Sequence, residues 1–235
     1  SMSDLFHESL TNEQIAAVFG VMALADTHCF QTLTKRSARM RAFFAARPVE
    51  LVAAWMHNAL ASGLSDLHPA DLAAHLTWPL GNVWLGVSAE DQAAADERIP
   101  DLLACPAAVR WVSYEPAIGA VDFGAWLGAD CPECAGEHDL HWLVVGGESG
   151  PGARPFDLAW ARSTIAQCKA AGVACFVKQL GKRPYDGDGF CGHGLNECPG
   201  GPHEMPPLHF SDRKGGDTSE WPVDLRVREW PGVTR

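Results

Sequence analysis

The apolar and polar positions along the chain follow two alternating periods. Some segments have apolar residues at helical spacing, and others are short, largely apolar runs typical of strands. The expected helices cover residues 11–25, 37–47, 49–63, 89–105 and 157–172. The expected strands cover residues 1–6, 28–35, 81–88, 109–116, 140–149 and 174–181. Because helices separate most of these strands, the pattern indicates a parallel sheet covered on both faces, or a barrel.

The fold class expected from this pattern is α/β, an incomplete (β/α) TIM-like barrel of about six parallel strands. From Gly181 onwards the regular pattern is lost, and residues 181–207 are rich in glycine, proline, cysteine and histidine. We therefore expect residues 1–180 to form the partial barrel, and residues 181–235 to form an irregular loop and a tail that packs on it. The tail residues expected to make that contact are Trp221, Leu225, Val227 and Trp230.

Charge and hydropathy limit the classes of function. The chain has 235 residues and a formal net charge of -11, which disfavours non-specific binding to a polyanion, since phosphate contacts need a basic face. A local basic pocket stays open, because residues 35–47 are the densest basic stretch. There is no apolar run of the ~20 residues that a membrane span requires, and no pattern of a secretion signal. We expect a cytoplasmic protein without a membrane partner, and the sequence indicates no oligomeric state.

Polar residues gather where the expected strands end. In parallel α/β folds the carboxyl ends of the strands form the edge at which ligands bind. A lysine ammonium suits a carboxylate or phosphate, and serine hydroxyls can donate beside it. The candidate binding residues for a zwitterionic or phosphorylated small molecule are therefore Ser3, Asp4, Lys35 and Ser88. The alternative for Lys35 is a solvated side chain that pairs with a nearby carboxylate.

The run "VVGGESGPGARP", residues 144–155, places two adjacent glycines after an apolar strand. Such glycines allow a ligand or another backbone to approach closely. Their spacing fits neither the dinucleotide-binding fingerprint nor a P-loop. Glu148, and Glu115 at the end of another strand, are the candidate general bases of a cluster-independent enzyme. The alternative for Glu148 is a tight turn in which it pairs with Arg154.

The cysteines divide into two groups of four. Those expected to be buried core thiols, because they lie in or at the end of apolar segments, are Cys29, Cys105, Cys168 and Cys175. Those that lie among Gly, Pro, Glu and His, on two irregular stretches, are Cys131, Cys134, Cys191 and Cys198. The C-x-x-C spacing of the first pair is typical of half a tetrahedral zinc site. We expect either a structural zinc that joins the two stretches or free surface thiols.

Six blocks of the sequence resemble an uncharacterised family of phage and bacterial proteins, the gene product 37/68 family. They are "SMSDLFHE", "FQTLTKRSARM", "NVWLGVSAEDQAAADERIP", "VRWVSYEP", "VVGGESGPGARP" and "DLRVREWP", and they span nearly the whole chain. Several are also similar, more distantly, to the spore photoproduct lyase branch of the radical S-adenosylmethionine (SAM) enzymes. That resemblance implies that Ser3, Asp4, Lys35 and Ser88 line a SAM site, with Lys35 facing the methionine carboxylate.

The same resemblance implies an iron–sulfur cluster and a substrate. Longer relatives carry three closely spaced cysteines, as a [4Fe-4S] cluster requires, before the strand that corresponds to residues 1–6. This sequence has no such trio. We expect either a missing N-terminal segment, which would also supply the first barrel strand, or a cluster-free derivative. The radical form would abstract hydrogen from a substrate, with a nucleotide or nucleic-acid base as the candidate. The alternative function is a non-catalytic, zinc-stapled binding module of phage origin.

Overall fold

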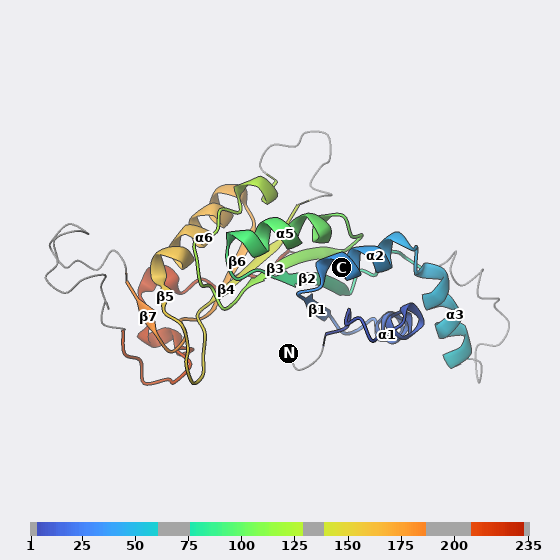
Figure 1. Ribbon diagram of the computed structural model, residues 1–235, viewed down its shortest axis with the longest axis horizontal. Helices are drawn as coiled ribbons and strands as arrows, with labels where there is room; N and C mark the ends of the chain where they lie inside the picture. The colour runs from blue at the N-terminus through green and yellow to red at the C-terminus, as the bar shows by residue number, and fades with distance from the viewer. Residues whose placement is uncertain (1–3, 61–75, 129–138, 187–207, 233–235) are drawn as a thin grey trace, which may run out of the picture.

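A five-stranded parallel sheet forms the centre of the protein (Figure 1), in a computed structural model that describes residues 4–60, 76–128, 139–186 and 208–232. The strands are β1 (Phe30–Thr34), β2 (Val83–Ser88), β3 (Val109–Tyr114), β4 (Trp142–Gly146) and β6 (Ala174–Gln179). Their order in the sheet is β1-β2-β3-β4-β6, so that β1 and β6 lie at opposite edges. The α/β class is thus confirmed. The sheet is open, because β1 and β6 do not pair with each other, so the expected TIM-like barrel is not confirmed.

The prediction of a strand over residues 1–6 is wrong for those of them that the structure describes. The segment that begins at Asp4 forms turns, and the Asp4 carboxylate accepts a hydrogen bond of 2.9 Å from the backbone N–H of Phe6. Aspartate favours this turn because its side chain can bond the backbone two residues ahead. Phe6 is fully buried and packs against the rings of Phe43 and Phe44, which anchors the turn. Residues 1–3 lie outside the described residues.

Each expected helix is present. The main helices are α1 (Asn12–Leu24), α2 (Ser37–Ala45), α3 (Val49–Leu60), α5 (Gln92–Leu103) and α6 (Leu158–Ala171). Single turns of 3-10 helix span η1 (Gly124–Trp126), η2 (Thr218–Glu220) and η3 (Val223–Leu225). Thr11 caps α1 in a capping box with Gln14, and Gly172 ends α6 with a φ of 70°, a conformation that glycine adopts without strain. The local signals in the sequence therefore place the helix ends well.

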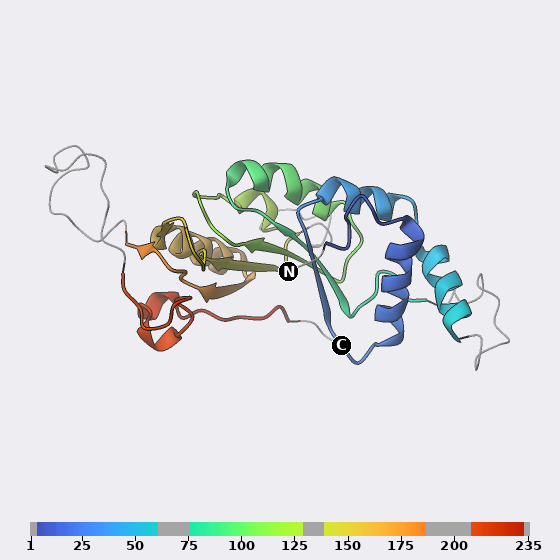
Figure 2. The ribbon, with the colours of Figure 1, turned by 60° about the horizontal axis from the view of Figure 1, so that its bottom comes forward.

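Helices α2, α5 and α6 lie on one face of the sheet (Figures 1 and 2), whereas α1 packs against α3 beyond the β1 end of the sheet. The strands direct Leu85, Val112 and Leu143 into the core on that face. The sequence left open a sheet covered on both faces or a barrel; in the described part of the chain α2, α5 and α6 share one face, and the sheet does not close into a barrel. Each strand pairs with the next one along the chain, and right-handed crossovers between such neighbours place their helices on the same side. The other face stays free of helices.

The C-terminal tail covers part of that other face (Figure 2). Its backbone runs antiparallel to the edge strand β6, with the Val177 N–H donating to the Val227 carbonyl at 2.8 Å. Trp221 and Leu225 are buried, as predicted, and Trp230 stacks on Trp142 with 4.8 Å between ring centroids. A small second sheet pairs β5 (Phe156–Asp157) with β7 (Pro184–Tyr185). The tail therefore packs on the sheet, as expected.

Two further expectations concern burial. Cys105, Cys168 and Cys175 are buried, as predicted, whereas Cys29 is exposed, so its expected place in the core is wrong. Cys29 precedes Phe30, the first residue of β1, and belongs to the exposed connection after α1. Among the described residues, no helix has the length and apolar character needed to cross a membrane.

Candidate functional site

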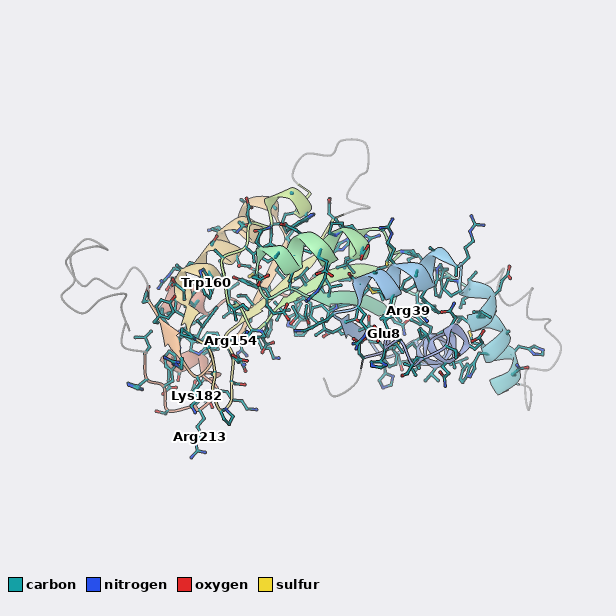
Figure 3. The ribbon with its side chains drawn as sticks, in the orientation of Figure 1. Glu8, Arg39, Arg154, Trp160, Lys182 and Arg213 are labelled. Carbon is teal, nitrogen blue, oxygen red and sulfur yellow. The ribbon has the colours of Figure 1, made fainter. Side chains whose placement is uncertain are left out.

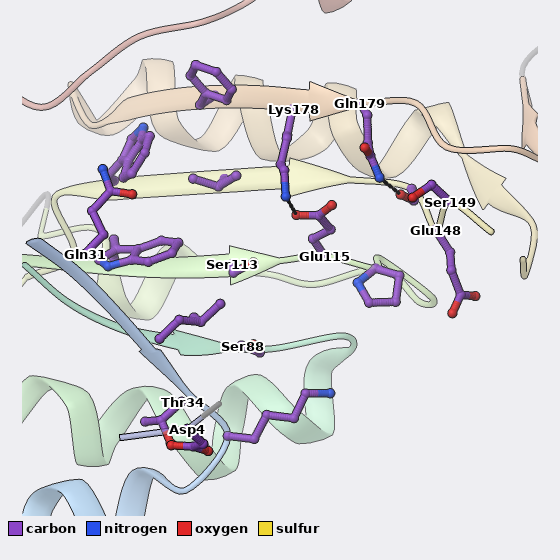
Figure 4. Close-up of a pocket in the computed structure, with 18 of the residues that line it drawn as sticks. Asp4, Gln31, Thr34, Ser88, Ser113, Glu115, Glu148, Ser149, Lys178 and Gln179 are labelled. Atoms are coloured by element: carbon purple, nitrogen blue, oxygen red, sulfur yellow. Dashed lines mark hydrogen bonds and ion pairs between the residues drawn. The ribbon is translucent and has the colours of Figure 1, made fainter. Parts of the chain in front are cut away.

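A cavity of about 1140 Å³ lies on the helix-free face of the sheet. It is lined by residues of all five strands or the turns that follow them, by the turn that begins at Asp4, and by Arg228 and Trp230 of the tail. Figure 4 shows the polar side chains at the arrowheads of the strands. The polar end of the cavity therefore lies at the carboxyl edge of a parallel sheet, where such folds bind ligands.

The register of the strands sorts the cavity walls into two zones. Trp111 on β3 lies opposite Trp142 on β4. Two residues further along β3, Ser113 lies opposite Ser88 on β2. We call the apolar zone the aromatic floor; its members are Trp111, Trp142, Phe176 and Trp230. We call the polar zone the polar rim; its members are Lys35, Ser88, Ser113, Glu115 and Lys178. One end of the cavity thus favours flat apolar groups, and the other favours charges and hydroxyls.

Lys35 follows β1 and lines the cavity, with 57% of its side chain exposed. Its ammonium pairs with Glu90, the alternative given by the sequence, and Arg98 donates to the same carboxylate at 2.9 Å. Burial lowers the pKa of Lys35, and the nearby charges of Arg98 and Arg154 lower it further. Two cations, Lys35 and Arg98, thus share the single carboxylate of Glu90, which leaves the Lys35 ammonium able to pair with an arriving anion.

Asp4 is already engaged by its own chain. It accepts hydrogen bonds of 2.8 Å from the Thr34 hydroxyl and 2.8 Å from the Arg36 guanidinium. Burial raises its pKa, but the hydrogen bonds from Thr34, Phe6 and Arg36 outweigh this effect and lower the pKa overall. The carboxylate thus holds the N-terminal turn against the end of β1. Ser3, the neighbouring candidate, lies outside the described residues.

Glu115 occupies the middle of the polar rim. One of its oxygens accepts a hydrogen bond of 2.8 Å from the Lys178 ammonium (Figure 4), and its side chain is 16% exposed. The other oxygen, Oε1, has no hydrogen bond within the described part of the chain. Glu115 therefore offers an acceptor to a ligand. The place of Lys178 beside Glu115 follows only from the pairing of β3, β4 and β6 in the sheet.

The aromatic floor was not predicted, although the sequence holds a signal for it. Trp84, Trp111 and Trp142 are the second, third and first residues of the successive strands β2, β3 and β4. The register places Trp111 opposite Trp142, and Trp84 opposite Val109, two residues before Trp111. Because side chains two residues apart along a strand share a face, all three indole rings lie on one face of the sheet. Gly86 contributes as well, because a side chain at this position would collide with the indole ring of Trp111. The Nε1 of Trp111 is buried and has no hydrogen-bond partner among the described residues.

Glu148 stands at the edge of the cavity in a turn that Arg154 closes. It accepts hydrogen bonds from Arg154 through the backbone N–H at 2.9 Å, Nε at 2.8 Å and Nη2 at 3.1 Å. These bonds lower the pKa of Glu148 to about 2. At neutral pH the carboxylate is therefore ionised and weakly basic. This is the pairing that the sequence offered as the alternative to a general base.

Replacing Arg154 with alanine should raise the pKa of Glu148 from about 2 towards its ordinary value of 4.5, because the charge-assisted hydrogen bonds are lost. Since the folded-state pKa is the depressed one, the pair stabilises the fold fully above about pH 4.5 and loses this effect as the pH falls towards 2. NMR titration of the Glu148 carboxyl carbon measures the shift. Arg213→Ala is the control, and an unchanged midpoint in Arg154→Ala would contradict the assignment.

The glycines of "VVGGES" serve a backbone contact. A Cβ on Gly147 would collide with the Leu180 carbonyl group and would lie 2.9 Å from the ring of Phe156. Facing it, Gly181 has a φ of 77°, and a Cβ there would lie 2.8 Å from the Glu148 carbonyl oxygen. The sequence left open a ligand or another backbone as the close neighbour. The structure places another backbone there, since the turns after β4 and β6 run against each other.

The metal-site predictions fall largely outside the described residues. The candidate zinc ligands there are Cys131, Cys134, Cys191 and Cys198. Across residues 4–60, 76–128, 139–186 and 208–232, no three metal-binding side chains come together. Of the four described cysteines none lines the cavity, and three are buried. Three thiolates for a [4Fe-4S] cluster are thus not available from the described residues, and the zinc site stays a prediction.

The chain matches, over residues 1–213, the model of a family described as "Protein of unknown function (DUF5131)". It belongs to this family. The polar rim lies within the matched residues, whereas Arg228 and Trp230 lie beyond them. Neither the curated proteins nor the solved structures contain a match to this chain. The expected membership of an uncharacterised family is therefore confirmed, and the more distant similarity to radical SAM enzymes remains a prediction.

Proposed function

We propose that the chain is a SAM-binding protein, and that the polar rim of the cavity holds the amino-acid end of the ligand. The observation that carries this proposal is the balance of charges in one cavity. Its lining includes the cations Lys35, Lys178 and Arg228 and the anions Asp4, Glu115 and Glu148. A site with equal numbers of both signs suits an amphoteric ligand better than a polyanion.

The carboxylate of the ligand would lie at Lys35. Lys35 and Arg98 bring two positive charges to one carboxylate, that of Glu90. Glu90 neutralises part of this charge, but it is shared between Lys35 and Arg98. An incoming carboxylate would therefore replace water in a field that remains positive.

The hydroxyl and amino groups of the ligand would meet the centre of the rim. Ser88 and Ser113 lie opposite each other on β2 and β3, about 4.8 Å apart across the sheet. Glu115 follows on β3 with Oε1 available as an acceptor, and carboxylates are common partners of ribose hydroxyls. These groups complement the polar parts of SAM that lie between its carboxylate and its base.

The fold adds support of a more general kind. Parallel strands in chain order, with helices on one face, are the arrangement found in part of a (β/α) barrel, the architecture that the resemblance to the lyase branch implies. Reductive cleavage of SAM needs a cluster bound by cysteine thiolates, and the described residues do not fit one. The proposal is therefore limited to binding and contains no radical step.

Isothermal titration of the full chain with SAM tests the proposal, and decarboxylated SAM is the matched ligand. SAM should bind with a micromolar dissociation constant, and decarboxylated SAM about tenfold more weakly or worse, because the contact to Lys35 is lost. Equal affinity for the two ligands would contradict the assigned role of Lys35. No binding of SAM at millimolar concentration would overturn the proposal and favour the zinc-stapled binding module.

A further inference from the structure

The cavity extends well past the groups assigned to SAM. Its volume of about 1140 Å³ exceeds the ~300–1,000 Å³ of a typical small-molecule site. The remaining part is bounded by β4, β6 and the tail, and its lining residues are Trp142, Phe176, Lys178, Arg228 and Trp230. We call this part the tail half-site. We infer that the tail half-site binds a mononucleotide, with the base stacked on Trp230 and the phosphate held by Lys178 and Arg228.

Trp230 provides the surface for the base. One face of its ring stacks on Trp142 with an interplanar angle of 30°, and the edge of Phe176 meets it at 5.4 Å. Even so, 58% of Trp230 is exposed, although it lines the cavity. An indole ring that is supported behind and exposed in front is the arrangement on which proteins stack bases. The stack is independent of the groups assigned to the amino-acid end of SAM.

Lys178 and Arg228 provide the positive charge. The Arg228 guanidinium lies 5.2 Å from the centre of the Phe176 ring and donates to the Lys178 carbonyl at 3.1 Å, which ties the tail to β6. A guanidinium has five N–H donors and an ammonium has three, so both groups keep donors beyond these contacts and the bond to Glu115. Both cations line the cavity and keep spare donors, which suits a phosphate.

The spacing along β6 favours a nucleotide over an aromatic acid. Ala174 lies opposite Trp142 in the sheet, and Lys178 follows four residues later, about 13 Å further along the strand. A ligand that stacks on Trp230 and also reaches Lys178 therefore needs a spacer between its ring and its anionic group. Arg228 lies nearer to the ring, since its guanidinium and Trp230 both flank Phe176, at 5.2 Å and 5.4 Å from the centre of the Phe176 ring. A ribose supplies that spacer between a base and its phosphate, whereas a benzoate carries its carboxylate on the ring.

A single nucleotide fits better than a nucleic-acid strand. Strand binding without sequence preference relies on a positively charged groove that follows many phosphates. The chain carries a net charge of -11, and the cavity lining balances three cations with three anions. The tail half-site thus offers charge for one phosphate. The inference rests on the proposed function only in taking the cavity to be a ligand site.

The test is equilibrium binding of adenosine monophosphate to the full chain, followed by intrinsic tryptophan fluorescence and by calorimetry. Adenosine should bind roughly tenfold more weakly than the monophosphate, because it lacks the charged group. Lys178→Ala and Arg228→Ala should abolish that difference, and Trp230→Ala should weaken both ligands. Matched controls are Lys182→Ala and Arg213→Ala, two exposed cations outside the cavity that Figure 3 shows in the lobe of β5, β7 and the tail.

Further binding experiments distinguish this inference from the SAM proposal. Monophosphate binding that persists at saturating SAM supports the inference. Strict competition that depends on Lys35 overturns it, since the nucleotide would then occupy the SAM site. SAM binding without monophosphate binding overturns the inference alone, and the reverse result overturns the SAM proposal alone. Tighter binding of a short single-stranded DNA than of the monophosphate overturns the assignment of a mononucleotide. Trp230→Ala must retain SAM binding, which shows that this variant is folded.

Discussion

Replacing Lys35 with alanine is expected to weaken SAM binding roughly 10- to 100-fold, since a hydrogen bond to a charged group contributes about 1.5–3 kcal/mol. The lower part of this range applies, because more than half of the Lys35 side chain is exposed, at 57%, and water screens the contact. Calorimetric titration of wild type and variant with SAM measures the change.

The fold should tolerate this substitution. Glu90, the partner of Lys35, retains Arg98 at 2.9 Å, so no carboxylate is left buried without a cation. The melting temperature of Lys35→Ala should therefore equal that of the wild type. Lys35→Arg keeps the charge and should recover part of the affinity. Lys182→Ala removes an exposed lysine outside the cavity and should bind SAM like the wild type.

Unchanged SAM binding by Lys35→Ala would contradict the role assigned to Lys35. If Lys35→Ala bound SAM as tightly as the wild type while decarboxylated SAM remained weak, the carboxylate would lie elsewhere in the cavity. Lys178 is the rim cation that would then become the first alternative. If both comparisons showed no loss, the rim would not recognise the carboxylate at all.

Local sequence signals were sufficient for the helices and most strands, because the determining contacts are close in the chain. The capping box of Thr11 and Gln14 and the glycine after α6 span only a few residues. The wrong prediction of a strand over residues 1–6 also depends on a contact between residues that are close in the chain. The apolar-polar alternation of these residues predicts a strand, whereas the Asp4 carboxylate accepts a hydrogen bond from the backbone N–H of Phe6 and makes a turn. The turn bond competes with strand pairing, and periodicity does not reveal which one prevails.

The site could be predicted only where a single strand carries the signal. Lys35, Ser88 and Glu115 follow from the rule that ligands meet the carboxyl ends of parallel strands. The tail half-site depends on contacts between distant segments. The Nε1 of Trp142 donates to the Glu229 carbonyl across a separation of 87 residues, and this contact brings Trp230 onto the aromatic floor. No local pattern in the sequence predicts against which edge strand of the sheet the tail packs.

Replacing Gly147 with alanine is expected to destabilise the fold by roughly 1–3 kcal/mol or more, because the added methyl group would overpack a site with no space. The collision is with the backbone carbonyl of Leu180 and the ring of Phe156, neither of which can turn away as a flexible side chain would. The Gly147 N–H also donates to the Gln179 carbonyl at 3.0 Å, so the backbone cannot withdraw without losing this bond. Thermal denaturation should show a melting temperature lower by roughly 2–12 °C.

Gly81→Ala is the matched control, since a Cβ at Gly81 meets no atom within 4 Å, and its stability should lie within about 0.5 kcal/mol of the wild type. Gly147→Ala should also affect the ligand site. Gly147 precedes Glu148 and faces the turn of Gly181, so a shift here moves the turns after β4 and β6 together. Gly147→Ala should therefore lose ligand binding along with stability, whereas Lys35→Ala should lose binding alone. A stable Gly147→Ala variant with intact binding would show that these two turns can separate without cost, contrary to the close backbone contact.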